Sequence, residues 1–368
     1  MFKKKAGIKL LAGVLVVIIV GAILSNKNSE LFRAYESKVL NIIHGKTLNS
    51  FFKTKIKSGN LSVDYTVDQT LKDVDSMKLN TVNVPIEVDI SDLSANSISV
   101  NKKSIEKAKI IIDKLNKRNI NVILEPYPWI NKGQDYETKM QPKDINKFFY
   151  VWKNQVVGKI IDEVAVPKRV DALCIASNFV NLENYSDKWC DIIDFSRSRY
   201  KGLITYKTNW WYTATWDKES KKKFNDKLNN KIFSKVDYIS VAAYFEITPN
   251  AVNNVDYIKN SLYATTINGR GQRIVDELNE LHEKWNKPIF FGELGFPRRD
   301  FASKEPWNPE PSNIEDGNEQ ARCFKAYKMV FTQSWFLGFS VFAIGNTEGI
   351  KNYYPSKESK EVIKEWFN

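Results

Sequence analysis

Short apolar runs and longer amphipathic runs alternate along the chain from about residue 51 to its end. The apolar runs are continuous, and each predicts a strand buried on both faces. The predicted strands span residues 52–61, 81–86, 121–126, 171–177, 202–208, 237–244, 288–292 and 338–344. Between them, apolar residues recur at helical spacing, as Ile274, Leu278, Leu281 and Trp285 do in 273–285. The other predicted helices span residues 66–78, 104–117, 143–163, 185–200, 220–233, 318–334 and 357–366.

This alternation predicts an α/β fold with eight strand–helix units. Continuously apolar strands are typical of a parallel sheet that is covered by helices. Eight such units in about 310 residues fit a single (β/α)8 TIM barrel with moderate insertions, which we expect to occupy residues 51–368. A doubly wound open sheet is the alternative, but no glycine-rich phosphate loop follows any predicted strand.

The first 25 residues have a different pattern, with four lysines in the first nine positions before an apolar run at 10–24. The run is at the short limit for a membrane span and the long limit for a signal-peptide core. No small-residue cleavage site and no cysteine for lipid attachment follow it, which favours an uncleaved signal-anchor. The lysines predict a cytoplasmic N-terminus and an extracellular barrel in the cell membrane, joined by a stem at 26–50.

Composition narrows the chemistry further. The net charge of +12 is spread over lysine-rich helices, which favours a generally basic surface over a nucleic-acid interface. The three cysteines have no metal-ligand spacing and there are only two histidines, so we expect no metal site and no histidine-based catalysis. We expect no organic cofactor. The 10 Trp, 16 Tyr and 21 Phe suit stacking on sugar rings as well as core packing.

In a TIM barrel the residues that follow the strands line the mouth, where the chemistry takes place. Here they are acids, amides and aromatic residues, the side chains that bind carbohydrates. The candidates are Glu125, Trp129, Asn178, Asn209, Trp210, Trp211, Tyr244, Glu246, Glu293 and Asn346.

Several of these residues also allow a structural interpretation. Glu293 could pair with Arg298 or Arg299, Glu125 could form a structural ion pair, and Tyr244 could belong to the core. Trp210 and Trp211 could pack within a long loop. Their joint placement at strand ends favours a sugar-binding cleft, in which Tyr244 would donate a hydrogen bond to Glu293.

The segments NTVNVPI, LCIAS, GLITYKTNWW, DYISVAAYFEIT and KPIFFGELGF, the last followed by EPWNPEP, occur in a characteristic order. In this respect the chain resembles glycoside hydrolase family 113, whose members are TIM-barrel retaining enzymes that include β-mannanases. The resemblance extends over essentially all of 51–368. It implies that Glu293 is the nucleophile and that Trp307 and the amides and aromatics after the fifth and sixth strands form sugar subsites.

The resemblance also implies an acid/base glutamate at the end of the fourth strand, where this chain has Asn178 within CIASNF. Shifting the register by one residue gives Asn178–Phe179 and still no acid. An amide cannot supply the proton that a retaining mechanism needs. Glu183 could fold back as a substitute acid, and Glu125 and Glu246 are further possibilities.

Two function classes therefore remain open. The chain could be a membrane-anchored glycoside hydrolase that acts on a β-linked polysaccharide, with mannan as one candidate. It could instead be a catalytically impaired pseudoenzyme that binds cell-surface polysaccharide or oligosaccharide. The sequence does not specify the sugar or the linkage.

Overall fold

The computed structural model describes residues 55–95, 97–347 and 352–367. The predicted membrane segment at 1–25 and stem at 26–50 lie outside these residues. Within them, no helix combines the length and the apolar character that a membrane crossing requires.

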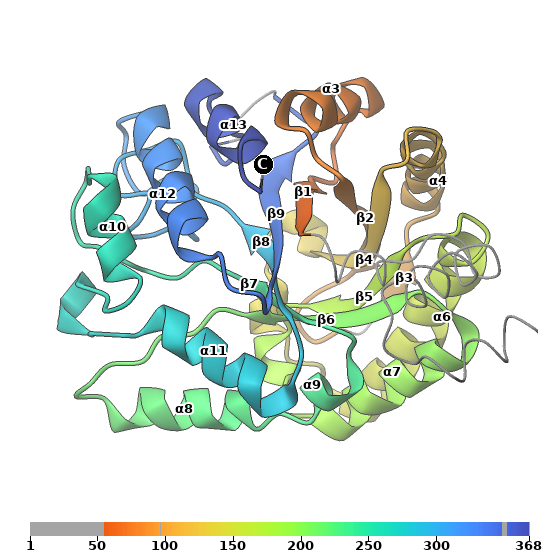
Figure 1. Cartoon of the computed structure of the whole chain (residues 1–368). Coiled ribbons are helices and arrows are strands. Elements are labelled where there is room, and N and C mark those ends of the chain that lie inside the picture. The colour runs from red at the N-terminus through yellow and green to blue at the C-terminus, as the bar shows by residue number, and fades with distance from the viewer. Residues whose placement is uncertain (1–54, 96, 348–351, 368) are drawn as a thin grey trace, which may run out of the picture.

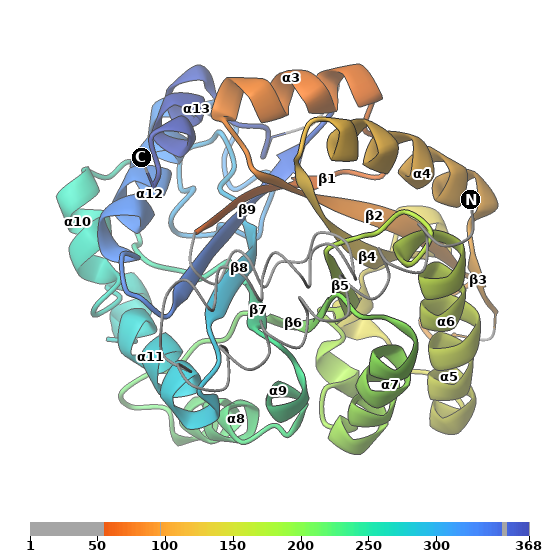
Figure 2. The ribbon, with the colours of Figure 1, turned by 45° about the vertical axis from the view of Figure 1, so that its right-hand side comes forward.

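The described chain forms a closed barrel of parallel strands (Figures 1 and 2). Successive barrel strands pair in parallel, and β1 pairs with both β2 and β9, which closes the sheet. The alternative of an open sheet is therefore wrong. The eight barrel strands are β1 (Ile56–Leu61), β2 (Thr81–Ile90), β4 (Asn121–Ile130), β5 (Ala172–Ser177), β6 (Leu203–Asn209), β7 (Ile239–Ala242), β8 (Ile289–Leu294) and β9 (Phe336–Ile344). A ninth strand, β3 (Ile98–Val100), was not predicted and pairs antiparallel with the end of β2.

Helices surround the barrel, as Figure 2 shows. The larger ones are α3 (Val67–Met77), α4 (Lys102–Lys117), α5 (Ile145–Val151), α7 (Ser186–Arg199), α8 (Lys218–Leu228), α11 (Ile274–Trp285), α12 (Gly317–Val330) and α13 (Lys357–Lys364). The predicted helix 143–163 is a composite, because α5 continues through π-helical turns at Trp152–Val157 and Ile161–Ala165 that flank α6 (Gly158–Ile160). Two further helices are α9 (Ile232–Lys235) and the unpredicted α10 (Val255–Ser261).

Short 3-10 turns shape the loops at the ends of the barrel strands. The ones that concern the site are η2 (Asn131–Gly133) and η3 (Glu137–Lys139) after β4, and η6 (Val180–Leu182) after β5.

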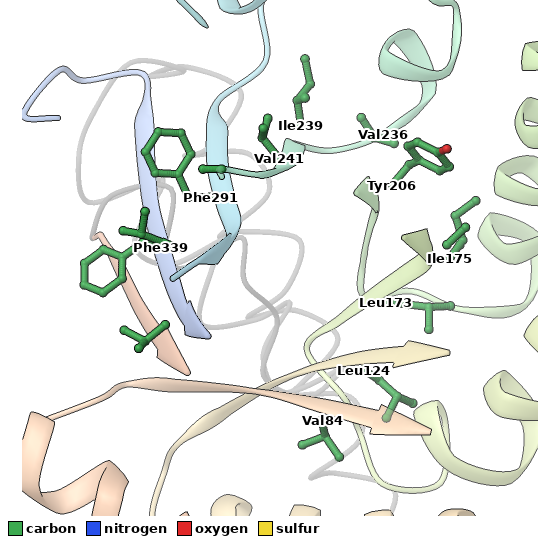
Figure 3. Packing of buried hydrophobic residues seen from close by; sticks show 14 of the residues in the cluster. Val84, Leu124, Leu173, Ile175, Tyr206, Val236, Ile239, Val241, Phe291 and Phe339 are labelled. Atoms are coloured by element: carbon green, nitrogen blue, oxygen red, sulfur yellow. The ribbon is translucent and has the colours of Figure 1, made fainter. Parts of the chain in front are cut away.

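Alternation along the strands divides the buried residues into two cores. Apolar side chains on the outer face pack against the helices, and Figure 3 shows some of them, among them Val84, Leu124 and Phe291. A second, smaller cluster is separate from the outer core. It consists of Ile56, Ile123, Ala172, Cys174, Leu203, Tyr238, Phe290 and Leu337. Since Ile123 and Leu124 are adjacent on β4, this second cluster fills the barrel interior, and the residues that follow it toward the strand ends are polar.

Candidate active site

Glu293 lies near the C-terminal end of β8 and is bound by a buried cation. The Nζ atom of Lys207, on β6, is 2.6 Å from Oε1 of Glu293 and 2.8 Å from Oε1 of Glu125. The alternative that Glu293 pairs with Arg298 or Arg299 is wrong. Arg298 pairs with Glu315, and Arg299 contacts Asn352.

Lys207 connects two carboxylates inside the barrel. Its side chain is 2% exposed, and burial alone would favour the neutral amine. Attraction to Glu125 and Glu293 outweighs this effect and raises the pKa of Lys207, so the side chain stays an ammonium. Gly292 provides the space for it, because a Cβ at position 292 would lie 2.9 Å from Cδ of Lys207 and 2.0 Å from Oγ of Ser240.

Glu125 belongs to this interior network, as its structural interpretation predicted. Asn83 on β2 donates a hydrogen bond of 2.9 Å to Oε2 of Glu125, and Asn83 also donates to Asn60 on β1. Asn60 in turn donates to the backbone oxygen of Gly292 at 2.8 Å. Because Glu125 is 4% exposed and held by Lys207 and Asn83, its contacts are those of an ion pair rather than of a sugar-binding residue.

The predicted hydrogen bond between Tyr244 and Glu293 is present, with the tyrosine hydroxyl donating to Oε2 at 3.0 Å. Asn178, just after β5, donates from Nδ2 to Oε1 of Glu293 at 3.5 Å. Its backbone φ is +55°, a left-handed conformation that asparagine tolerates better than most residues. Phe179 points elsewhere and packs against Trp152 and Trp189. Asn178 is therefore the residue of this pair that faces Glu293.

The expectation that Glu183 could reach Glu293 is wrong. The carboxylate of Glu183 pairs with Lys227 at 2.8 Å and accepts a hydrogen bond from the Thr208 hydroxyl. Neighbouring residues on a strand point to opposite faces, so Thr208 and Lys207 lie on different faces of β6. Glu183 therefore lies on the helix side of the strand, away from Glu293.

Glu246 also lies apart from the central ion pair. Its carboxylate accepts hydrogen bonds from the Trp307 indole, at 2.9 Å, and from the Arg270 guanidinium. Arg270 in addition lies 4.4 Å from the centre of the Tyr212 ring. These contacts fix Trp307, which is 48% exposed, at the end of β7. The acid that sequence reasoning considered as a catalytic substitute is thus engaged in holding an exposed indole.

Three aromatic candidates differ in their surroundings. Trp211 is buried, stacks on Phe224 and donates its indole N–H to Glu277 at 2.8 Å, so it is a packing residue rather than an open platform. Trp210 and Asn209 line a cavity of about 570 Å3 that also includes Glu183 and Lys227. Trp129 is half-buried on β4, against Gly133 of η2.

Asn346 follows β9 and donates to the backbone oxygen of Asp64 at 3.4 Å. This contact joins the loops after β9 and β1. Its predicted role in binding a sugar stays a prediction.

Sequence reasoning missed several residues close to Glu293. The Tyr244 ring packs edge-on against Phe342 and Tyr353, which form one wall beside the carboxylate. Burial raises the pKa of Tyr353, and the charge of Glu293 contributes. Phe342 belongs to β9, but Tyr353 lies far beyond the end of that strand. Only its aromatic character within the last loop could have suggested it.

The most consequential residue missed is Glu137, in η3. Its carboxyl group neighbours the Asn178 side chain, which favours its ionised form, and interacts electrostatically with Glu293. Burial raises the pKa of Glu137 to about 7, with a further contribution from the charge of Glu293. Glu137 is the seventh residue after the end of β4 and the eleventh after the predicted strand end at residue 126, and no motif marks it.

No group of three or more His, Cys, Asp or Glu side chains in the described residues is arranged to hold a metal ion. The side chains that meet at Glu293 are a carboxylate bound to an ammonium, a tyrosine hydroxyl, an amide and a second carboxyl group of raised pKa. Such a set can attack an electrophilic carbon and exchange a proton beside it.

Comparison with solved structures finds proteins of the same fold. A GH113 β-1,4-mannanase has a TM-score of 0.66 at 18% identity, with 85% of this chain and 98% of that chain covered. The GH113 β-mannanase AaManA from Alicyclobacillus acidocaldarius, in complex with ManMIm, also has a TM-score of 0.66, at 17% identity, with 85% and 97% covered. An endoglucanase has a TM-score of 0.52 at 12% identity, with 85% of this chain and 98% of that chain covered.

These identities show a shared fold, and no curated protein matches the chain. The family itself is shown by the model named Glycoside Hydrolase Family 113, which matches residues 52–360 and thus nearly the whole barrel. The chain therefore belongs to Glycoside Hydrolase Family 113.

Proposed function

We propose that this protein is a membrane-anchored extracellular glycoside hydrolase that cleaves a β-linked polysaccharide of mannan type by a retaining mechanism. Glu293 is the nucleophile in this proposal. The observation that supports it best is the set of contacts around Glu293, in which Lys207 and Tyr244 hold its two oxygens. Both contacts stabilise and orient the carboxylate for attack on an anomeric carbon.

The substrate class is proposed from the solved relatives and from the aromatic residues near the strand ends. The two solved structures with a TM-score of 0.66 are described as β-mannanases. In this chain Tyr136, Tyr212 and Trp307 are exposed in the loops after β4, β6 and β8, and exposed rings of this kind stack on sugar faces. The basic lysine flank at the N-terminus supports the proposed anchor.

The experiment is to treat the full-length protein with a fluorinated β-mannosyl fluoride, which traps the glycosyl-enzyme of a retaining glycosidase. We expect a mass increase on the peptide that contains Glu293, and hydrolysis of β-mannan. The Glu293→Gln variant should show neither, while its thermal melt shows that it is folded. Failure to label Glu293 with this reagent or with the corresponding glucosyl and xylosyl reagents would refute the proposal.

A second function is favoured by one observation, the amide of Asn178 at the position facing Glu293. A pseudoenzyme would bind β-mannan through the same cleft without turning it over. Binding of manno-oligosaccharides in calorimetry, together with no labelling of Glu293, would establish this function instead.

A further inference from the structure

Glu137 lies in a segment that is held by backbone hydrogen bonds directly after it. The backbone N–H of Met140, a fully buried residue, donates to the carbonyl oxygen of Glu137 at 3.1 Å. The next residue, Gln141, donates to the carbonyl oxygen of Leu93 at 2.9 Å. The turn η3 packs against η6, the turn that begins two residues after Asn178. The loop after β4 is thus held against the end of β5, where Asn178 contacts Glu293.

Asn178 neighbours both carboxyl groups. Its side-chain amide contacts Oε1 of Glu293 at 3.5 Å and favours the ionised form of the nearby Glu137 carboxyl group. Retaining glycosidases place their two carboxyl groups about 5–5.5 Å apart. Glu137, which neighbours the same amide as Glu293, is our candidate for the second carboxyl group of such a pair.

The two carboxyl groups have opposite electrostatic surroundings. Glu293 is in direct contact with the ammonium of Lys207. Glu137 is desolvated and repelled by Glu293, which raises its pKa to about 7, while Asn178 and the more distant Lys207 act against the shift. Tyr127, whose hydroxyl has a raised pKa because it is buried, stays neutral and is a further titratable neighbour of Glu137. Surroundings that differ in this way suit Glu293 to nucleophilic attack and Glu137 to proton transfer.

Building on the proposed function, we infer that Glu137 is the catalytic acid/base and that Asn178 is a positioning residue for it. In the first step a Glu293 oxygen attacks the anomeric carbon, the glycosidic C–O bond breaks, and the leaving oxygen takes the proton of Glu137. In the second step a water molecule gives a proton to ionised Glu137. The water oxygen attacks the anomeric carbon, and the bond between this carbon and Glu293 breaks, which frees the Glu293 carboxylate. The acid thus comes from the loop after β4 rather than from the end of β5.

The test compares wild type with Glu137→Gln in the full-length protein, on β-mannan and on dinitrophenyl β-mannoside. Hydrolysis of β-mannan should fall about 10²–10⁴-fold, because its alkoxide leaving group needs the proton. The phenolate leaves without it, so the aryl mannoside should still label Glu293 in a burst. Added azide should then restore turnover and give the β-mannosyl azide, since azide attacks from the face that Glu137 occupies.

Two further variants separate a chemical role from a structural one. Asp135→Asn removes a carboxylate in the same loop that is bonded to Asn131, and it should leave both activities unchanged. Asn178→Ala removes the donor that favours ionised Glu137, so the alkaline limb of the kcat/KM profile should move to higher pH. A merely structural effect of either residue would not move this limb or produce the azide adduct.

The outcomes are distinct. If wild-type Glu293 is labelled but Glu137→Gln hydrolyses β-mannan at the wild-type rate, the inference about Glu137 is overturned and the proposed function stands. The inference about Glu137 is also overturned, and the proposed function stands, if the Glu137→Gln variant is folded in its thermal melt but inactive on both substrates, and azide restores no turnover. If no reagent labels Glu293 in the wild type, the proposed function fails and the inference about Glu137 fails with it.

Discussion

At the scale of single residues, the centre of this barrel depends on one lysine. Lys207 → Met would leave Glu125 and Glu293 facing a buried apolar side chain, without the ammonium that contacts both. Removing one partner of a buried ion pair typically costs about 3–5 kcal/mol of unfolding free energy. We expect a loss of this size in urea denaturation at pH 7.

The matched control is the double variant Lys207→Met, Glu125→Gln, in which one of the stranded charges is also removed. It should recover part of the lost stability, because Asn83 can still hydrogen-bond the glutamine oxygen. A single variant as stable as wild type would show that the ion pairs contribute nothing to folding.

The raised pKa of Glu137 predicts that the free energy of unfolding depends on pH. Its pKa is about 7 in the folded protein, above the value of about 4.3 in an unfolded chain. The folded state therefore binds the proton more tightly, so this contribution is complete below about pH 4.3 and is lost as the pH rises through 7. Since the side chain is only half-buried, we expect wild type to lose about 1–2 kcal/mol relative to Glu137→Gln between pH 5 and pH 8. Parallel pH profiles of the two proteins in urea denaturation would contradict this prediction.

At the scale of elements, the sequence predicted all eight barrel strands, because continuous apolar runs mark strands covered on both sides. The ends were less predictable. The predicted strand ends at Pro126, yet β4 continues to Ile130 in register with β2. A proline removes one N–H donor but leaves the extended backbone intact, so the pairing persists. This extension carries Tyr127 and Trp129 beyond the point at which the sequence placed the end of the strand.

The predicted positions of site residues were less accurate in the loops than on the strands. The position of Glu293 follows from its strand alone, and it was predicted. The position of Glu137 depends on how residues 131–141 fold back onto the turn after β5, through contacts such as Gln141 with Leu93. Such contacts join residues far apart in the sequence, and they produce no periodic pattern of apolar residues from which they could be predicted. Glu183 was favoured instead because it is near Asn178 in the chain, although strand alternation places it on the other face of β6.

At the scale of the whole molecule, the direction of the strands relates the cleft to the predicted anchor. Lys55, the first residue described, precedes β1, and parallel strands all begin at the same end of a barrel. Glu293 and its neighbours lie toward the opposite end. The chain thus enters the barrel at the face away from the cleft, so a stem joined to a membrane segment would leave the cleft directed outward, where a large polysaccharide can reach it.

The location itself is a prediction that cells can test. The four lysines ahead of the apolar run predict that the N-terminus stays in the cytoplasm and that the barrel is outside. Protease added to intact cells should therefore digest the barrel, while a tag placed ahead of Phe2 should resist digestion until the membrane is opened. A variant in which Lys3, Lys4, Lys5 and Lys9 are replaced by glutamine serves as the control. It should weaken the preferred orientation, because the charge difference across the span is removed. Recovery of the full-length protein from the soluble cytosolic fraction would contradict both the anchor and the outward orientation.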